Sequence, residues 1–329
     1  MLLKISERLR PFSHLPGTLC PLPGTARVFQ VFPAMLRTSF EGNVEEIPLD
    51  IRGPVERFTV SLDLEKGLIR VWGREERGYF RYRIQAASES DWEILAEKGL
   101  LPFSKREREE RPPLSLERLS LGCHRAQDWQ MVCRRGDLAE IFPFWYRLGQ
   151  LVPQEKSRVR GGTLSLLEDC FGEEELYVCF EKLFKAGFEG ILSPKLIDDL
   201  HLGFDLPQLA EEDSAFPLLS EGWLAIRRLL VEESGEVFRI LPRLPKQFHA
   251  GRLLDAKVGN GLSLSLEWSK KRIKKIAAEA ALPTELNLSL ERGIESFRLR
   301  REKGDRGSKL QANKPLKLQP GRYFLDRFT

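Results

Sequence analysis

The chain has 329 residues, which is long enough for two or three domains. Of these residues 42% are hydrophobic and 30% are charged, as in ordinary globular proteins, and this composition excludes wholesale disorder. It contains no run of about 18 apolar residues, which excludes a membrane-spanning helix. The net charge of +4 neither favours nor excludes a nucleic-acid partner.

The amino terminus and the cysteines favour a cytoplasmic location. Pro11 and Pro16 interrupt the segment in which a secretory signal would be apolar. The cysteines are odd in number and no two are spaced as CxxC, which disfavours both a disulfide framework and a zinc site. We therefore predict a cytoplasmic protein with free thiols, no metal and no cofactor. The cysteines are Cys20, Cys123, Cys133, Cys170 and Cys179.

The first third of the chain has the pattern of an antiparallel sheet. Apolar and polar residues alternate from Phe58 to Leu64, which is typical of a half-buried strand. Turn residues follow at Glu65–Gly67, the chain returns as a strand over 68–72, and the alternation resumes over 80–84. We predict an amino-terminal β domain over residues 1–104, followed by a charged, proline-ended linker at 105–116.

The middle third, residues 117–235, has helical periodicity. Asp137 is a candidate cap for a helix with apolar residues at helical spacing up to Leu148. Residues 218–233 predict a closing helix in which Arg227 and Arg228 face outward.

The last third, residues 236–329, returns to the strand pattern. Apolar residues alternate with polar ones from Leu262 to Trp268, and Lys270 and Lys271 form a turn. The predicted fold is a multi-domain α+β protein in which two antiparallel β-sandwich-like domains flank a helical segment.

One stretch, Leu218–Ala278, resembles a known family. A closing helix leads into a double-proline turn, a glycine step and a strand that ends in tryptophan. This order is similar to the end of family 95 glycoside hydrolases, the inverting α-L-fucosidases and their relatives, where the last helix of an (α/α)6 barrel runs into a β domain. The matching residues are Leu241, Pro242, Leu244, Pro245, Gly251, Asn260, Gly261 and Trp268. The two prolines hold an extended corner, the two glycines permit tight turns, and the tryptophan fills the core of the sandwich.

The chain departs from that family in its helical part. An (α/α)6 barrel has twelve helices and needs on the order of 300 residues, whereas residues 117–235 are far fewer. The family's inverting reaction uses a Glu general acid, an Asp general base and Asn side chains that orient water. All asparagines of this chain (Asn43, Asn260, Asn287, Asn313) lie outside the helical segment. The resemblance therefore implies a remnant of the barrel without its hydrolytic machinery.

A second likeness covers Leu119–Gln130 and Leu138–Pro153, with the sequences LSLGCHRAQDWQ and LAEIFPFWYRLGQLVP. These segments are similar to uncharacterised proteins of chlamydial bacteria. The likeness implies a bacterial protein and supplies no activity.

Four residues are candidates for catalysis. In a helix, His124 and Asp128 would be four residues apart on one face, where the carboxylate can orient the imidazole, although such a pair also serves to tie elements together. Asp198 and Glu221 are candidate carboxylates of a glycoside hydrolase, which needs two of them about 6.5 to 9.5 Å apart for inversion. Glu140, Asp199 and Asp205 are further acidic candidates, and loops also collect Asp for turns.

Aromatic residues are dense in the helical segment, at Trp129, Trp145, Tyr146 and Trp223. Sugar rings stack on such faces, so these are the candidate ligand-binding residues. Core packing is the other interpretation of the same residues.

Positive charge is concentrated at the carboxyl terminus. Residues 269–329 contain 16 Lys and Arg against 7 Asp and Glu, and include KKRIKK at Lys270–Lys275. Such a region is typical either of a protein that binds nucleic acid or acidic surfaces or of the solvated edge of a sheet.

The leading hypothesis is a non-catalytic protein, derived from a glycoside hydrolase, that binds a carbohydrate or a protein partner. One alternative is a glycan-active enzyme that uses carboxylates of the helical segment. The other is a binder of nucleic acid or acidic surfaces through the basic carboxyl terminus.

Overall fold

The computed structural model describes residues 3–40, 43–99, 116–154, 160–172, 175–199, 206–209, 214–259, 261–301, 304–312 and 314–329. The predicted linker at 105–116 lies outside these ranges except for its last residue. The chain divides into two compact units, each assembled from separate segments. Unit 1 comprises Met1–Glu7, Ser115–His124 and Leu224–Thr329, and unit 2 comprises Arg8–Leu114 and Arg125–Trp223. The predicted helical segment thus contributes residues to both units.

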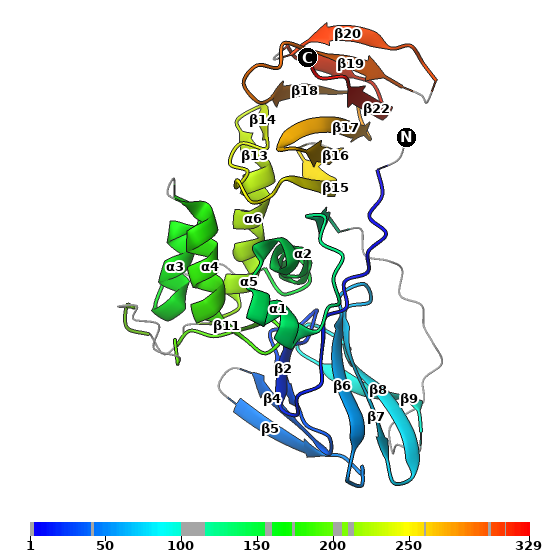
Figure 1. Ribbon diagram of the computed structural model, residues 1–329, viewed down its shortest axis with the longest axis vertical. Coiled ribbons are helices and arrows are strands. Elements are labelled where there is room, and N and C mark those ends of the chain that lie inside the picture. The colour runs from blue at the N-terminus through cyan, green and yellow to red at the C-terminus, as the bar shows by residue number, and fades with distance from the viewer. Residues whose placement is uncertain are drawn as a thin grey trace. The chain divides into compact units, whose positions relative to one another are not determined.

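Unit 2 contains two antiparallel sheets. The five-stranded sheet has the order β1–β6–β7–β8–β9, and the four-stranded sheet has the order β2–β3–β4–β5 (Figure 1). Their strands are β1 (Phe12–Ser13), β2 (Thr18–Pro21), β3 (Val28–Val31), β4 (Met35–Phe40), β5 (Asn43–Pro48), β6 (Glu56–Asp63), β7 (Leu68–Glu75), β8 (Gly78–Ala86) and β9 (Trp92–Lys98). The meander predicted over residues 58–84 is therefore confirmed as β6, β7 and β8.

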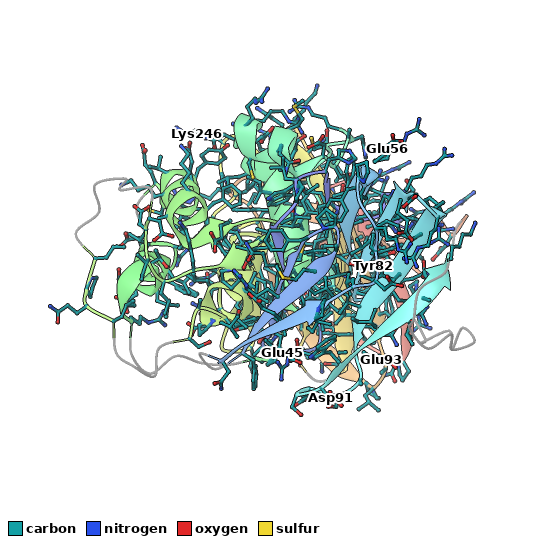
Figure 2. All side chains as sticks on the ribbon, turned by 90° about the horizontal axis from the view of Figure 1, so that it is seen from below. Glu45, Glu56, Tyr82, Asp91, Glu93 and Lys246 are labelled. Carbon is teal, nitrogen blue, oxygen red and sulfur yellow. The ribbon has the colours of Figure 1, made fainter. Side chains whose placement is uncertain are left out.

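Alternation places the core of the five-stranded sheet on one face. Val60, Val71, Tyr82 and Ile84 are fully buried. Figure 2 shows Tyr82 among the strands of this sheet. On the opposite face β7 and β8 present several arginines to solvent, whereas residues 58–63 of β6 are buried on both faces.

The helices follow later in the chain and lie in unit 2, except that the last one continues into unit 1. They are α1 (Trp129–Arg135), α2 (Leu138–Gly149), η1 (Gly162–Leu164, a 3-10 turn), α3 (Ser165–Asp169), α4 (Leu176–Gly187), α5 (Pro217–Ser220) and α6 (Gly222–Leu230), with a two-stranded ribbon of β11 (Phe188–Glu189) and β12 (Ser193–Pro194) after α4. Asp137 caps α2, as predicted, because its carboxylate accepts the Ala139 amide at 3.0 Å. Trp145 is fully buried and donates from Nε1 to the Leu218 carbonyl at 3.0 Å.

Unit 1 contains a seven-stranded antiparallel sheet in the order β10–β15–β16–β17–β22–β19–β20 and a four-stranded sheet in the order β13–β14–β18–β21. The strands are β10 (Arg118–Ser120), β13 (Val231–Ser234), β14 (Val237–Ile240), β15 (Ala250–Val258), β16 (Leu262–Ser269), β17 (Arg272–Ala280), β18 (Thr284–Ser289), β19 (Ser296–Arg300), β20 (Ser308–Gln311), β21 (Leu316–Leu318) and β22 (Gly321–Asp326). Burial alternates strictly along β16, so the predicted strand over 262–268 is confirmed.

The last helix, α6, ends in unit 1, where one of its arginines differs from expectation. Arg227 is not outward-facing: its side chain is 14% exposed, and its Nε donates to both carboxylate oxygens of Glu117 at 3.1 and 3.2 Å. Glu117 also accepts the Lys257 amide at 2.9 Å. A buried acid explains the inward cation, because either charge alone would be costly to bury. Arg228 is exposed, as predicted.

Strands before and after a helical stretch make this a β-rich α+β protein with several antiparallel sheets, and to that extent the predicted fold class is confirmed. Of the helices that the structure describes, none combines the length and the apolar character needed to cross a membrane.

Candidate ligand-binding pocket

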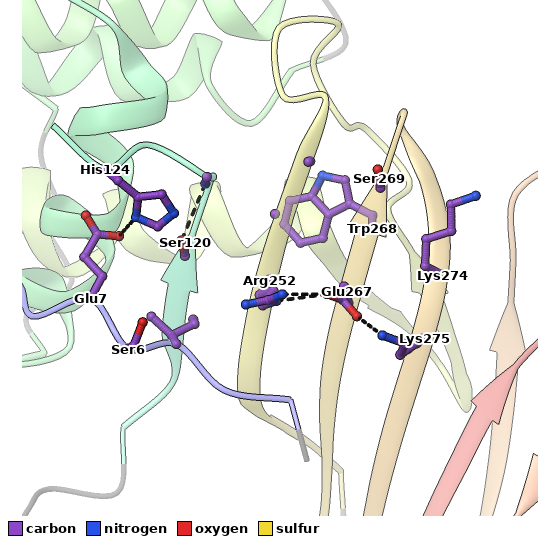
Figure 3. Close-up of a pocket in the computed structure, with 14 residues that line it drawn as sticks. Ser6, Glu7, Ser120, His124, Arg252, Glu267, Trp268, Ser269, Lys274 and Lys275 are labelled. Carbon is purple, nitrogen blue, oxygen red and sulfur yellow. Dashed lines mark hydrogen bonds and ion pairs between the residues drawn. The ribbon is translucent and has the colours of Figure 1, made fainter. Parts of the chain in front are cut away.

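A pocket of about 420 Å³ lies within unit 1 (Figure 3). It is lined by residues 5–7 of the amino-terminal segment, by β10 and the residues that follow it, and by the ends of β15, β16 and β17. Its ionisable lining residues are Glu7, His124, Arg252, Glu267, Lys274 and Lys275, and Ser6, Ser120 and Ser269 contribute hydroxyl groups. The lining therefore combines apolar surface with donors and acceptors from several separate segments.

A glycine opposite a tryptophan shapes one wall. Gly251 and Trp268 face each other across β15 and β16, and a Cβ on Gly251 would stand 2.7 Å from the Ser120 carbonyl oxygen and closer still to the indole. Trp268 is 1% exposed and donates from Nε1 to the Phe248 carbonyl at 3.3 Å. Gly251 was expected to permit a tight turn; it lies instead within a strand, where it makes room for the ring.

Three charged side chains form a row across three neighbouring strands. The register pairs Arg252 with Glu267 and Glu267 with Lys275. Arg252 Nη2 lies 2.8 Å from Oε1 of Glu267, and Lys275 Nζ lies 2.6 Å from Oε2. Arg252 also donates from Nη1 to the Lys4 carbonyl at 3.1 Å. Figure 3 shows the row along one side of the pocket.

The row fixes the charge of Glu267. Burial alone would raise the pKa of this carboxyl, but the hydrogen bonds and positive charges of Lys275 and Arg252 outweigh burial and lower it below its ordinary value. Glu267 is therefore a carboxylate at neutral pH, with each oxygen already accepting a hydrogen bond.

On another side of the pocket, Glu7 faces His124. Nδ1 of His124 lies 3.8 Å from Oε2 of Glu7, and the side chains are 72% and 15% exposed. Burial raises the pKa of Glu7, and the charges of His124 and Arg118 offset this only in part. The two carboxyl groups of the pocket thus have pKa values displaced in opposite directions.

The β16–β17 hairpin adds exposed cations beside the pocket. Lys270 and Lys271 form its tip, both with positive φ (54° and 62°), and the Lys271 amide donates to the His249 carbonyl at 2.9 Å. Lys274 is exposed and lines the pocket.

Of the four predicted catalytic residues, only His124 lines this pocket. The expected helical pairing of His124 with Asp128 is wrong, because α1 begins at Trp129 and His124 precedes it outside any helix. Asp128 is the cap of α1, and its carboxylate accepts the amides of Gln130 at 3.1 Å and Met131 at 3.4 Å.

Asp198 and Glu221 belong to unit 2. Glu221 is 12% exposed and accepts from Arg160 Nη2 at 2.9 Å, while Asp198 is half-buried in the loop after β12. Glu140 is buried against Arg135 at 2.7 Å, and Asp199 lies 3.5 Å from Lys195. Asp205 lies outside the described residues. Each described acidic candidate of unit 2 therefore either contacts a cation or lies in a loop. Their catalytic role stays a prediction.

The predicted aromatic ligand residues are all in unit 2. Trp129 is 3% exposed, and Trp145 and Tyr146 are fully buried, which is where core packing places them. Trp223 is half-buried, contacts Tyr146 edge-on at 5.6 Å between ring centroids, and donates to Gln154 at 3.1 Å. Stacking on a sugar stays a prediction, and Trp223 is the one of the four with appreciable exposure.

Some arginines of the basic carboxyl-terminal region form ion pairs within their own sheet. Arg298 and Arg300 both contact Asp326, and Arg322 lies 2.6 Å from Glu279. These pairs are typical of a solvated sheet. Other cations of this region, among them Lys270, Lys271 and Lys274 of the hairpin, are exposed.

Sequence reasoning missed Glu7, Arg252, Glu267 and Lys275. Strand alternation places the last three on β15, β16 and β17, but the register that aligns them is set by turns and bulges. Glu7 reaches the pocket from an irregular segment that carries no sequence signal.

Within the described ranges, no group of three or more His, Cys, Asp or Glu side chains could hold a metal ion. A scan against models of known protein families gives no match for this chain, and a search of the curated proteins gives none either.

Proposed function

We propose that the protein binds a saccharide in the unit 1 pocket and does so without catalysis. The observation that carries the proposal is the row of Arg252, Glu267 and Lys275, which presents N–H donors beside a carboxylate at spacing fixed by the sheet. A sugar hydroxyl both donates and accepts, so it matches a wall that offers both. The three serine hydroxyls of the lining add further partners.

The resemblance to family 95 glycoside hydrolases supports the proposal that the protein descends from a carbohydrate-active enzyme. In that family the strand ending in tryptophan belongs to the β domain that follows the barrel, and in this chain that strand lines the pocket. The described helices α1 to α6 fall short of the twelve that close a barrel. We infer a descendant of such a hydrolase that kept its β domains, in sandwich-like form, and a reduced helical segment.

A glycan array probed with the purified protein tests the proposal. Lys275→Ala removes one cation of the row, and Arg322→Ala removes a cation of the same sheet that does not line the pocket. We expect a saccharide whose binding weakens about ten-fold in Lys275→Ala, since a charged hydrogen bond is worth about 1.5 kcal/mol or more. Binding in Arg322→Ala should be unchanged. Absence of any bound saccharide, or equal losses in both variants, would contradict the proposal.

Hydrolysis of a glycan is the second candidate, because two carboxyl groups with oppositely displaced pKa values line one pocket. In such a reaction Glu7 would be the general acid toward the departing glycosidic oxygen, and Glu267 would be the base that takes a proton from the attacking water. Glu267 already accepts hydrogen bonds at both oxygens, which favours binding over this role. Turnover of aryl glycosides that is lost in Glu7→Gln would establish the enzyme; no turnover supports the binding protein.

A further inference from the structure

The outward face of the five-stranded sheet in unit 2 carries an unusual set of side chains. Arg70, Trp72 and Arg74 alternate along β7, and Tyr79, Arg81 and Arg83 alternate along β8; we call these six the arginine face. Their neighbours in sequence, such as Val71 and Tyr82, are fully buried in the core. The pleat of the sheet therefore places all six on the side away from the core.

Two carboxylates are shared among four arginines at this face. Asp63 Oδ2 lies 3.1 Å from Arg10 Nε and 3.0 Å from Arg70 Nη1. Glu97 lies 3.1 Å from Arg70 Nε, 2.7 Å from Arg81 Nε and 3.9 Å from Arg83 Nη1. These arginines are 14–35% exposed, and Arg74 is more exposed still. Positive charge exceeds negative charge within this cluster.

The arrangement places like charges beside each other. Arg70 and Arg83 are directly opposite each other in the register, and like charges in such a pair destabilise a sheet. The exposed guanidinium of Arg74 and the partly exposed ones of Arg10 and Arg81 remain within reach of an external anion.

Aromatic rings stand among the cations. Trp72 is half-buried and pairs across the strands with Arg81, while Tyr79 is 45% exposed and pairs with Arg74. Recognition of a polyanion by charge alone does not require aromatic rings. Recognition of a single-stranded nucleic acid does, because its bases stack on aromatic side chains while its phosphates contact Arg.

We propose that the arginine face of unit 2 binds single-stranded nucleic acid, with arginines on the phosphates and with Tyr79 and Trp72 against the bases. The residues of this face belong to unit 2 and those of the pocket belong to unit 1, so the proposal does not depend on saccharide binding. The face also differs in place from the basic carboxyl terminus, which belongs to unit 1.

Fluorescence anisotropy with a labelled oligouridylate of about 12 nucleotides tests the proposal, within the site sizes that single-strand binders use. Tyr79→Ala and Arg74→Ala change exposed side chains, and Arg134→Ala removes an exposed arginine of α1 as the matched control. We expect Tyr79→Ala to weaken binding about ten-fold without changing the salt slope. Arg74→Ala should reduce the slope of log affinity against log salt by about 0.7, and Arg134→Ala should change neither.

Three results would overturn the proposal. The first is no binding of the oligonucleotide at low salt. The second is binding that responds equally to Arg74→Ala and Arg134→Ala, which is general attraction to a basic protein. The third is heparin binding at equal strength with no effect of Tyr79→Ala, which assigns the face to polyanions of another class. Arg252→Ala in unit 1 should leave oligonucleotide binding intact.

Discussion

At the scale of single residues, Gly251 and Trp268 depend on each other. A methyl group on Gly251 would overlap the indole and press on the Ser120 carbonyl. We predict that Gly251→Ala lowers the free energy of unfolding by about 1–3 kcal/mol, the usual cost of overpacking, as measured by urea denaturation. In a Trp268→Leu background the same change should cost at least about 1 kcal/mol less. Equal costs in both backgrounds would show that the ring is not the obstacle.

The ion pairs of Asp326 should make the stability of the fold depend on pH. Hydrogen bonds from Arg298, together with the charge of Arg300, hold the pKa of this carboxyl below its ordinary value of 3.8, despite burial. A lowered pKa stabilises the fold above the unfolded pKa, and this contribution is lost as pH falls through the folded pKa. Asp326→Asn should therefore cost about 1–2 kcal/mol at pH 7. In denaturation curves at stepwise lower pH, the gap to the unaltered protein should close below pH 3.8; a gap independent of pH would contradict this.

Residue roles were the least predictable feature of the sequence. His124 was singled out, but for a pairing with Asp128 that the start of α1 at Trp129 rules out. Its neighbour Glu7 is 117 residues earlier in the chain, and no local pattern links the two. Contacts between distant segments depend on the fold, which spacing alone does not encode.

At the scale of elements, the β16–β17 hairpin is built on an unfavourable turn. Both central residues, Lys270 and Lys271, have positive φ, which Asn and Gly adopt more easily than Lys. We predict that the double variant Lys270→Asn, Lys271→Gly raises the free energy of unfolding of unit 1 by about 1 kcal/mol. Lys274→Asn, which removes a charge from the strand without changing the turn, is the control and should give no gain. A loss of stability in the double variant would refute the turn assignment.

The elements themselves were largely predictable. Alternation identified β6, β8 and β16, the hairpin turn before it identified β7, and Asp137 marked the start of α2. These signals are local, because burial on one face imposes a period of two or 3.6. The burial of Arg227 was not predicted, because it depends on an ion pair with Glu117, which is 110 residues away in the sequence.

At the scale of the whole molecule, the chain passes between its two units four times, after Glu7, Leu114, His124 and Trp223. Each unit has its own sheets and its own buried apolar residues. We predict more than one transition in denaturant unfolding monitored by hydrogen exchange. Gly251→Ala should shift the transition of unit 1 and leave that of unit 2 in place. A single transition that moves as a whole would mean that the units unfold together.

The division into units could not be predicted from the sequence. Composition places β, α and β regions in order along the chain, which suggests consecutive domains. Residues 115–124 belong instead with the carboxyl-terminal sheet, because β10 pairs with β15. Such pairing is long-range and leaves no compositional boundary.

The central claim, a saccharide in the unit 1 pocket, is tested most directly by hydrogen–deuterium exchange with the best ligand from the glycan array. We predict slower exchange at residues 5–7 and 120–124 and at the β16–β17 turn, which line or adjoin the pocket. Exchange around Trp223 in unit 2 should be unchanged. Protection around Trp223, with none at the pocket segments, would contradict the account.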